Sequence, residues 1–373
     1  MLTNSKLKTL MAVGQSPWYD NIDRRLIQNG RLENLFRLGI TGVTSNPSIF
    51  EKAVNSSSVY DSSIQQQANA GKTPHEICDF ITKKDIQSAA DLLYNTYKAT
   101  KGRDGYVSLE VYPDYAYDPG KTIDCARRIH KEVARPNLMI KIPGTNEGCE
   151  AISFLTREGI NINATLLFSL RHYEGSAMAY IDGIRKRLRD GNSVDRICSV
   201  ASVFVSRVDT KVDKILDDIN IGHLKGKIAV ANAKIIYQRF KELFFNGYFS
   251  DVAAKGARVQ RVLWGSTSTK NPAYSDVKYV DELIGKDTIN TLPHNTLEAF
   301  LDHGTPRLTI EEDLDKAKEY LYLLQQQRIN LDKTCDEIQT EGVDAFRNSF
   351  KKLIHAVADK VSNNPFIPQV RKS

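Results

Sequence analysis

The chain has 373 residues, of which 41% are hydrophobic and 26% are charged, and its formal net charge is +6. Its basic residues are scattered among acidic ones, and no helix-turn-helix, zinc-finger or RNA-binding motif is present, which argues against a nucleic-acid partner. No apolar run approaches the roughly eighteen residues that a membrane-spanning helix needs. We therefore expect a soluble globular protein that acts neither on nucleic acid nor in a membrane.

The cysteines and histidines argue against disulfides and a metal site. The five cysteines are widely spaced and include no C-x-x-C pair, as in proteins with reduced thiols. The seven histidines show no ligand spacing such as H-E-x-x-H. The N-terminal residues also lack the apolar segment of a secretory signal. These observations predict a cytoplasmic protein without a metal.

Short buried-strand patterns recur along the chain and alternate with helical patterns. In chain order, strands are predicted at 18–20, 39–45, 105–112, 138–143, 161–168, 197–205, 259–264 and 288–292. Helices are predicted between them at 22–38, 121–134, 147–158, 172–190, 209–219 and 226–245. Eight strands that alternate with helices in a chain of this size predict an α/β fold, a closed (β/α)₈ TIM barrel.

Two stretches exceed what such a barrel requires. Residues from about 51 to 101 carry helical segments after the second strand, and residues from about 310 to 373 follow the eighth. Both are polar and periodic, which is typical of helices that pack on the barrel exterior or over its mouth. We expect a single domain over 1–373, with a helical insert and a C-terminal helical extension.

One lysine occupies an unusual place for its charge. Lys141 lies within the apolar, β-branched run 138–142, which Pro143 and Gly144 end, so the run predicts a strand buried on both faces. Keeping an ammonium group charged in such surroundings is costly, and burial therefore favours the neutral amine. A neutral amine at a strand end is what Schiff-base chemistry with a carbonyl compound needs. A strand-end lysine that reaches water or pairs with a carboxylate is the alternative.

Side-chain parity gives this lysine polar neighbours. Alternate residues of a barrel strand point to the interior, and on several predicted strands one parity is polar while the other is apolar. The polar sets lie near the carboxyl ends of the strands, where barrel enzymes carry their active sites. They comprise Asp20, Thr44, Asn46, Ser108, Glu110, Lys141, Asn161, Asn163, Thr165 and Ser202. Convergence of five other strands around the lysine favours a reactive site over satisfied polar packing.

Two cations follow later strands and could bind a phosphoryl group. Arg207 comes directly after the sixth strand, and Lys270 follows the seventh within a run of serines and threonines. A cation beside hydroxyl groups and turn amides at a barrel mouth can bind phosphate. Each position is weak evidence alone, because loop cations usually lie in solvent. Two P-loop lookalikes, at 71–73 and 120–122, lack the glycine required five positions earlier.

Five ordered motifs resemble those of the transaldolases. They are Thr44-Ser45-Asn46-Pro47-Ser48-Ile49-Phe50, Ser108-Leu109-Glu110-Val111, Ile140-Lys141-Ile142-Pro143, Asn163-Ala164-Thr165-Leu166-Leu167-Phe168-Ser169 and Ser202-Val203-Phe204-Val205-Ser206-Arg207. The resemblance runs from about 18 to 303, and the added helices resemble the long bacterial branch of that family. It implies a transferase of the pentose phosphate pathway, with a class I aldolase barrel, sugar phosphate substrates and neither cofactor nor metal.

The resemblance also implies roles for matching residues. Lys141 would form the Schiff base with a ketose phosphate such as sedoheptulose 7-phosphate or fructose 6-phosphate. Glu110 would act through a water that Thr165 holds, and Asp20 would take the proton of the substrate C4 hydroxyl. The transferred dihydroxyacetone unit would pass to glyceraldehyde 3-phosphate or erythrose 4-phosphate. The implied substrate-binding residues are Asn46, Asn163, Ser202, Phe204, Arg207 and Lys270, of which Ser202 and Arg207, helped by Lys270, would bind phosphate.

Two other functions are weighed against transfer. A fructose-6-phosphate aldolase would release dihydroxyacetone, but that branch tends to carry Gln and Tyr where this chain has Glu110 and Phe204. A noncatalytic sugar-phosphate-binding barrel should have lost Lys141, Glu110 or Asp20, and all three are present. Gly144, Ala164 and Val203 depart from the family pattern beside the site. The resemblance leaves the assembly open, with a homodimer as one form.

Overall fold

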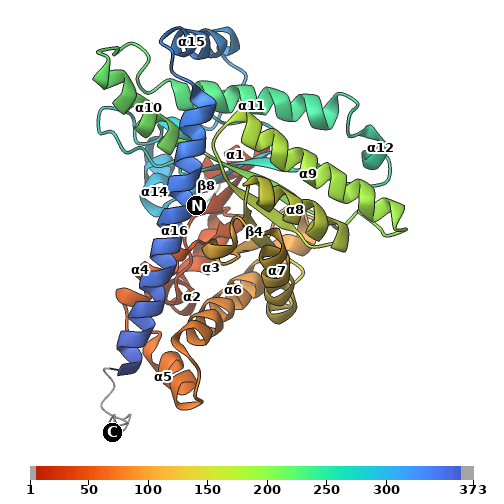
Figure 1. The fold of residues 1–373 in the computed structure, drawn as a ribbon, viewed down its shortest axis with the longest axis vertical. Helices are drawn as coiled ribbons and strands as arrows, with labels where there is room; N and C mark the ends of the chain where they lie inside the picture. Colours follow the sequence, from red (N-terminus) through yellow and green to blue (C-terminus); the bar gives the residue numbers. More distant parts are fainter. Residues whose placement is uncertain (1–5, 363–373) are drawn as a thin grey trace.

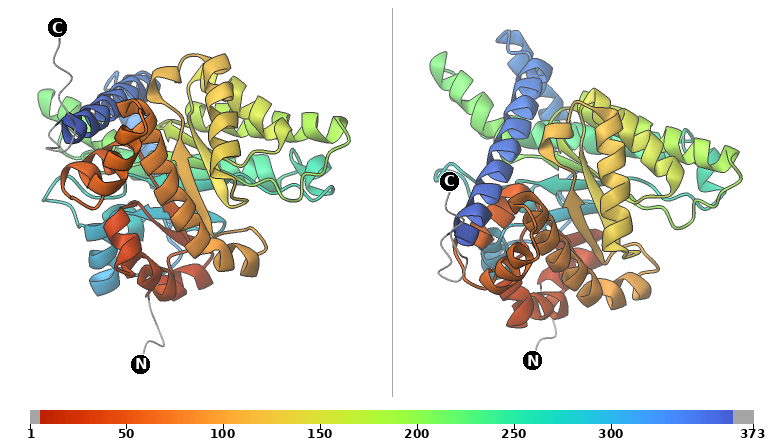
Figure 2. Two further views of the ribbon diagram at one scale, coloured as in Figure 1. Left: turned by 90° about the horizontal axis from the view of Figure 1, so that it is seen from below. Right: turned by 60° about the horizontal axis from the view of Figure 1, so that its bottom comes forward.

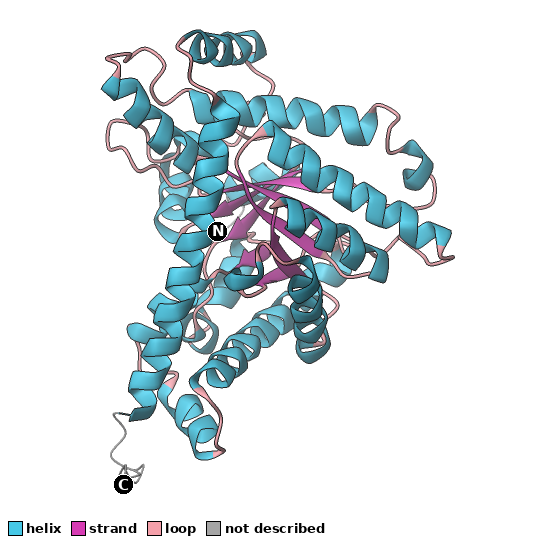
Figure 3. Cartoon of the chain, viewed as in Figure 1, coloured by secondary structure: helices cyan, strands magenta, loops and turns pink. Residues whose placement is uncertain are grey.

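Eight parallel strands close into a barrel in the computed structural model of this protein, which describes residues 6–362. The strands lie at the centre and the helices surround them (Figures 1 and 3). Each strand pairs with its neighbours in chain order, and β8 closes on β1. The strands are β1 Gln15–Tyr19, β2 Gly42–Thr44, β3 Tyr106–Glu110, β4 Leu138–Pro143, β5 Ile162–Leu167, β6 Ser199–Phe204, β7 Arg261–Gly265 and β8 Thr288–Leu292. The predicted (β/α)₈ barrel is confirmed.

The helices follow the expected order, with one correction. They are α1 Lys6–Ala12, α2 Arg24–Gln28, α3 Arg31–Leu38, α4 Pro47–Asn55, α5 Asp61–Asn69, α6 Pro74–Ala99, η1 Pro113–Tyr115, α7 Pro119–Val133, α8 Asn146–Glu158, α9 Leu170–Arg189, α10 Ser206–Asp218, α11 Ile228–Phe245, α12 Ser250–Ala253, α13 Lys278–Asp281, α14 His294–His303, α15 Leu314–Gln326 and α16 Leu331–Ser362. The single helix predicted at 22–38 is wrong. It is two helices, because Gly30 takes a left-handed φ of 74° between them.

The barrel interior separates from the outer core as side-chain parity requires. Met139 packs inside the barrel with Trp18, Tyr106, Val200, Leu263 and Ile289. Leu138, Ile140 and Ile142 of the same strand belong instead to the larger core between strands and helices. Lys141 shares the parity of Met139, so β4 directs the lysine into the barrel. Strand β3 presents Glu110 directly opposite Lys141 in the ladder.

The amino-terminal end of the barrel is closed by a buried ion pair. Arg261 lies 3.0 Å from Asp104, and both side chains are buried. The Asp104 carboxylate also accepts hydrogen bonds from Ser16 (2.8 Å) and Trp18 (2.9 Å). Arg261 donates a further bond to the Ser16 hydroxyl at 2.9 Å. Every charged group in this plug therefore has partners, as buried charges require.

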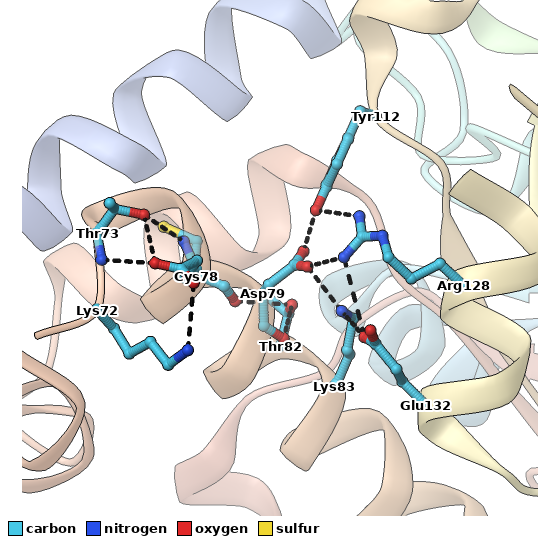
Figure 4. A network of polar contacts seen from close by, with 10 residues as sticks. Lys72, Thr73, Cys78, Asp79, Thr82, Lys83, Tyr112, Arg128 and Glu132 are labelled. Atoms are coloured by element: carbon cyan, nitrogen blue, oxygen red, sulfur yellow. Dashed lines mark hydrogen bonds and ion pairs between the residues drawn. The ribbon is translucent and has the colours of Figure 1, made fainter. Parts of the chain in front are cut away.

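The helices after the second strand pack on the barrel side. Asp79 of α6 contacts Lys83 of the same helix, Arg128 of α7 and Tyr112, which follows β3 (Figure 4). Lys83 also pairs with Glu132 of α7. Helix α6 begins with a capping box in which Thr73 and Glu76 satisfy each other's backbone amides. This polar network joins the insert to the barrel.

The C-terminal stretch forms two helices, and the second crosses the barrel. Helix α16 is 32 residues long and extends from α15 and α11 past the strands to α4 and α5 (Figure 1). It packs on α4, α6 and α10 and touches β5. Both views of Figure 2 show it beside α4. Within residues 6–362, no helix has the length and apolar character needed to cross a membrane.

Candidate active site

Lys141 is buried where β4 meets its neighbours. Its side chain lies inside the barrel with 3% of the residue exposed. The Nζ atom is 3.5 Å from Oε2 of Glu110 and donates a hydrogen bond of 3.2 Å to the Ser45 carbonyl. The apolar ring of Phe346 lies beside the amine as well, with its centroid 5.7 Å from Nζ. The lysine is held in one position with its nitrogen beside a carboxyl group.

Glu110 is buried without the hydrogen bonds that usually accompany a carboxylate. Among residues 6–362, no group donates a hydrogen bond to either of its carboxyl oxygens. Burial raises the pKa of Glu110 to about 7, although the charge of Lys141 acts in the opposite direction. The Thr165 hydroxyl, on the other side of β4, is likewise buried without a partner in the described chain. A carboxyl group with this pKa can give or accept a proton near neutral pH.

Asp20 lies just beyond β1 and is positioned by two threonines. The Thr44 hydroxyl donates to Asp20 at 2.7 Å and lies 2.8 Å from the hydroxyl of Thr291. Burial raises the pKa of Asp20, while Lys141, Thr44 and Lys270 act against that rise. The strands β2 and β8 therefore fix the direction of a third ionisable group at the same end of the barrel.

Asn163 connects three strands across the interior. Its amide nitrogen donates to the Ser108 hydroxyl at 3.0 Å, and its oxygen accepts from Ser202 at 2.7 Å. These bonds join β3, β5 and β6 and fix the orientation of the amide, which lies opposite Lys141 in the ladder. Both ends of Asn163 are used within the barrel. Asn46 differs, because its oxygen caps α4 by accepting from Ile49 and its amide NH₂ can donate to a ligand.

A cavity of about 330 Å³ opens above this cluster. Its wall brings together seven of the ten site residues predicted from the sequence: Asp20, Asn46, Lys141, Ser202, Phe204, Arg207 and Lys270. The remaining predicted residues, Glu110, Asn163 and Thr165, are buried behind this wall. The structure thus separates groups that can touch a ligand directly from groups that act from behind the lysine.

The cations of the cavity lie beside hydroxyl groups, as the sequence predicted. Arg207 is at the start of α10, and burial lowers the pKa of its guanidinium group. Ser266 and Ser268 line the same cavity, and the Ser266 hydroxyl lies 2.9 Å from that of Ser206. Lys270 is exposed on the same loop. Two cations and adjacent hydroxyls form a suitable site for a phosphoryl group.

Sequence reasoning missed several wall residues. Lys52 of α4, Thr291 of β8 and Phe346 of α16 line the cavity. Thr291 shares the interior parity of its strand with Ile289, and this spacing could have identified it. Phe346 carries no local signal of a role in the site, because it is one apolar position on a long amphipathic helix.

Gly144 departs from the family pattern for a visible packing reason. A Cβ atom at this position would lie 2.1 Å from Cδ2 of Leu167, so an alanine would require that side chain to move. The Gly144 amide donates to the Thr165 carbonyl at 2.7 Å. Glycine and Leu167 therefore fit each other beside the strand that carries the lysine.

The fold and cavity define the class first: a parallel-barrel enzyme with its ionisable groups at the carboxyl ends of the strands. The transaldolase/fructose-6-phosphate aldolase family model matches residues 17–357. The chain is 43% identical to a transaldolase of Trichodesmium erythraeum, over 97% of this chain and 98% of the relative. It is 43% identical to transaldolase 2 of Nostoc punctiforme, with the same coverage, and 40% identical to a transaldolase of Saccharopolyspora erythraea, over 97% and 99%.

The chain therefore belongs to the transaldolase/fructose-6-phosphate aldolase family. The comparisons confirm the prediction of a transferase of the transaldolase type.

Proposed function

We propose that this protein transfers a dihydroxyacetone unit between sugar phosphates through a Schiff base on Lys141, within the pentose phosphate pathway. The donor would be sedoheptulose 7-phosphate or fructose 6-phosphate, and the acceptor glyceraldehyde 3-phosphate or erythrose 4-phosphate. One observation carries the proposal: a buried amine lies 3.5 Å from an otherwise unpartnered carboxyl group, on the wall of a cavity with a carboxylate and cations. Family membership supports the same reaction.

The first half of the reaction joins the substrate to the enzyme. The Lys141 amine attacks the ketose carbonyl, and the resulting carbinolamine loses water to give an iminium ion. Glu110 supplies and removes protons through a water molecule that the Thr165 hydroxyl holds. The pKa of about 7 that burial gives Glu110 suits a group that must act both as acid and as base.

The second half breaks and remakes a carbon–carbon bond. Asp20 takes the proton of the C4 hydroxyl, the C3–C4 bond breaks, and its electron pair moves into the iminium group to give an enamine. The aldose fragment leaves and a second aldose enters. The enamine carbon attacks the new aldehyde, and Asp20 returns its proton to the oxygen. The hydrogen bond from Thr44 keeps the Asp20 carboxylate directed at the cavity.

Substrate binding is divided between the two ends of the sugar. Asn46 orients the dihydroxyacetone unit, whereas Asn163, whose amide is bonded to Ser108 and Ser202 behind the cavity wall, orients the surroundings of the lysine. Arg207 and Ser202 bind the phosphoryl group, and Lys270 assists. Phe204 packs against Phe168 at a ring-centroid distance of 5.6 Å and gives the site an apolar wall beside Arg207.

The test is borohydride trapping with fructose 6-phosphate, followed by peptide mass spectrometry. The expected adduct lies on Lys141, and Lys141→Met should abolish both adduct and turnover while the chain stays folded. Lys234 is an internal control, because it is also buried but donates to the carbonyls of Thr309 and Glu312 outside the cavity. An adduct on Lys234, or none, would refute the mechanism. Release of dihydroxyacetone without acceptor at the rate of transfer would favour the aldolase alternative.

We also propose a cytoplasmic location, which five free thiols support.

The domain organisation remains a prediction that limited proteolysis can test. It treats 1–373 as one catalytic domain, with an insert at about 51–101 and an extension at about 310–373. A homodimer likewise stays a prediction for measurement in solution.

A further inference from the structure

Phe346 covers the lysine, although it lies outside the sequence motifs of the barrel strands. It lies on α16, which belongs to the C-terminal extension, yet it lines the same cavity as Lys141 and Asp20. The phenyl ring is 4% exposed, and its centroid is 5.7 Å from Lys141 Nζ. A large apolar side chain thus closes one side of an otherwise polar cavity beside the nitrogen that would react.

The position of this ring is fixed by contacts on both sides of it along α16. Two turns earlier, the Gln339 side chain donates to the carbonyls of Gly144 (3.1 Å) and Leu166 (2.9 Å). One turn later, the Ser349 hydroxyl lies 2.7 Å from that of Ser48 on α4. The helix is therefore attached to the ends of β4 and β5 and to the segment after β2.

Close approach of the helix also depends on a glycine. A Cβ atom at Gly342, one turn before Phe346, would lie 3.0 Å from Leu166 Cδ2 and 3.4 Å from the Arg207 guanidinium. The absence of a side chain at this position lets α16 rest directly on the barrel mouth. Phe346 is consequently held over the cavity rather than beside it.

Resting on the function proposed above, we propose that Phe346 determines whether the Schiff-base intermediate is transferred or released. After C3–C4 cleavage, release needs a proton on the enamine carbon, which gives the dihydroxyacetone iminium ion. One water then adds to the C=N carbon, and the carbinolamine collapses to dihydroxyacetone and the free amine. Hydrolysis of an iminium ion also ends a transfer cycle, so protonation of the enamine carbon by solvent is the step that only release requires. The Phe346 ring keeps solvent from the nitrogen and hence from the enamine group attached to it.

The chain offers a matched control one turn further along α16. Phe350 has the same side chain on the same helix, but it packs on the ring of Tyr112 at 5.2 Å and on His75 at 5.6 Å. It does not line the cavity of Lys141 within the described chain. Phe350→Leu therefore reproduces a loss of aromatic packing on α16 outside the cavity of Lys141, although Phe350 borders a separate cavity that Glu110 also lines.

The experiment measures dihydroxyacetone released from fructose 6-phosphate relative to dihydroxyacetone transferred to erythrose 4-phosphate. Phe346→Leu should raise this ratio by about tenfold, a factor typical of removing part of an apolar pocket, and Phe346→Ala should raise it further. Phe350→Leu should leave it unchanged. The melting temperatures of all variants show whether they are folded. If Phe346→Ala unfolds, Phe346→Leu still tests the proposal, because leucine keeps much of the side-chain volume.

Borohydride trapping in the same samples separates the two proposals. If the Lys141 adduct forms normally but neither Phe346 variant changes the ratio, the role of Phe346 is refuted and the Schiff-base mechanism stands. If Phe350→Leu raises the ratio as much as Phe346→Leu, the role of Phe346 is also refuted, because loosening of α16 would suffice. If the wild-type protein forms no adduct on Lys141, both proposals fail together.

Discussion

Gln339→Leu is expected both to slow the reaction and to weaken the fold. Gln339 on α16 bridges two neighbouring strands, because its amide nitrogen donates to the carbonyl of Gly144, just beyond β4, and to that of Leu166 in β5. These strands carry Lys141 and Thr165. Leucine has a similar size but cannot donate, so both carbonyls would lose their partner.

The backbone beneath this bridge is strained. Leu166 has a φ of 57°, in the left-handed region that a residue with a branched side chain rarely adopts. It lies in a β-bulge: between the pairs Ala164↔Ala201 and Leu167↔Val203, β5 advances three residues and β6 advances two. Thr165 therefore stands on the bulge itself. Such a conformation costs on the order of 1–3 kcal/mol and persists only where surrounding contacts fix it.

The expected magnitudes follow from these contacts. Two lost hydrogen bonds at about 1 kcal/mol each should lower the free energy of unfolding by ~2 kcal/mol, measured by urea denaturation. If the bulge then relaxes, the Thr165 hydroxyl shifts from the position in which it would hold the water used by Glu110. The turnover number kcat should then fall by about tenfold to a hundredfold. KM for fructose 6-phosphate should change little, because Arg207 and Lys270 follow β6 and β7 rather than β4 or β5.

Thr340→Ala provides the control for this variant. Thr340 is exposed on the next position of α16, and its hydroxyl bonds only to the Asp336 carbonyl of the same helix among the described contacts. It should alter stability and kcat by no more than about 0.5 kcal/mol. A Gln339→Leu protein that loses ~2 kcal/mol but keeps the wild-type kcat would show that Gln339 has only a structural role.

Three further outcomes are expected. Burial raises the pKa of Glu110 from 4.5 to about 7. Its contribution to stability is therefore complete below pH 4.5, and the free energy of unfolding falls by ~3 kcal/mol as the pH rises to about 7. Urea denaturation should show a smaller loss over this interval in Glu110→Gln. Arg207→Gln should raise KM for phosphorylated donors by about tenfold to a hundredfold. As a check, the variant and the wild-type protein should have equal kcat/KM for an unphosphorylated donor. Arg261→Met should lower the free energy of unfolding by about 3–5 kcal/mol, because it leaves Asp104 buried without its cation, and calorimetry that found no loss would contradict the plug's role.

The barrel was predictable because its strands are short, apolar and regularly spaced. The predicted bounds 138–143 and 288–292 coincide with β4 and β8. The interior direction of Lys141 and Glu110 was also predictable, because alternation along a strand is a local property that the sequence states directly. Seven predicted residues line one cavity, because the strands direct Lys141, Ser202 and Phe204 into it and the other four follow the carboxyl ends of strands.

The remaining features depend on contacts between distant parts of the chain. Phe346 and Gln339 enter the site only because α16 crosses the barrel, and their spacing on a helix indicates an inner face but not what that face covers. The bulge at Leu166 has no sequence signal, because its left-handed residue is neither glycine nor asparagine. The ion pair of Arg261 and Asp104 joins residues 157 positions apart.

The two ends of the barrel treat a buried carboxyl group in opposite ways. At the amino-terminal end, Asp104 accepts hydrogen bonds from Ser16, Trp18 and Arg261, so its charge is fully compensated. At the carboxyl end, Glu110 is as deeply buried but receives no hydrogen bond from the described chain. Hydrogen bonds and an ion pair stabilise the charged form of a carboxylate. A buried carboxyl group without hydrogen bonds has its pKa raised toward neutrality, as in Glu110. Burial alone therefore does not mark the reactive end of this barrel; the missing hydrogen bonds do, because they leave the Glu110 carboxyl free to exchange protons with its neighbours.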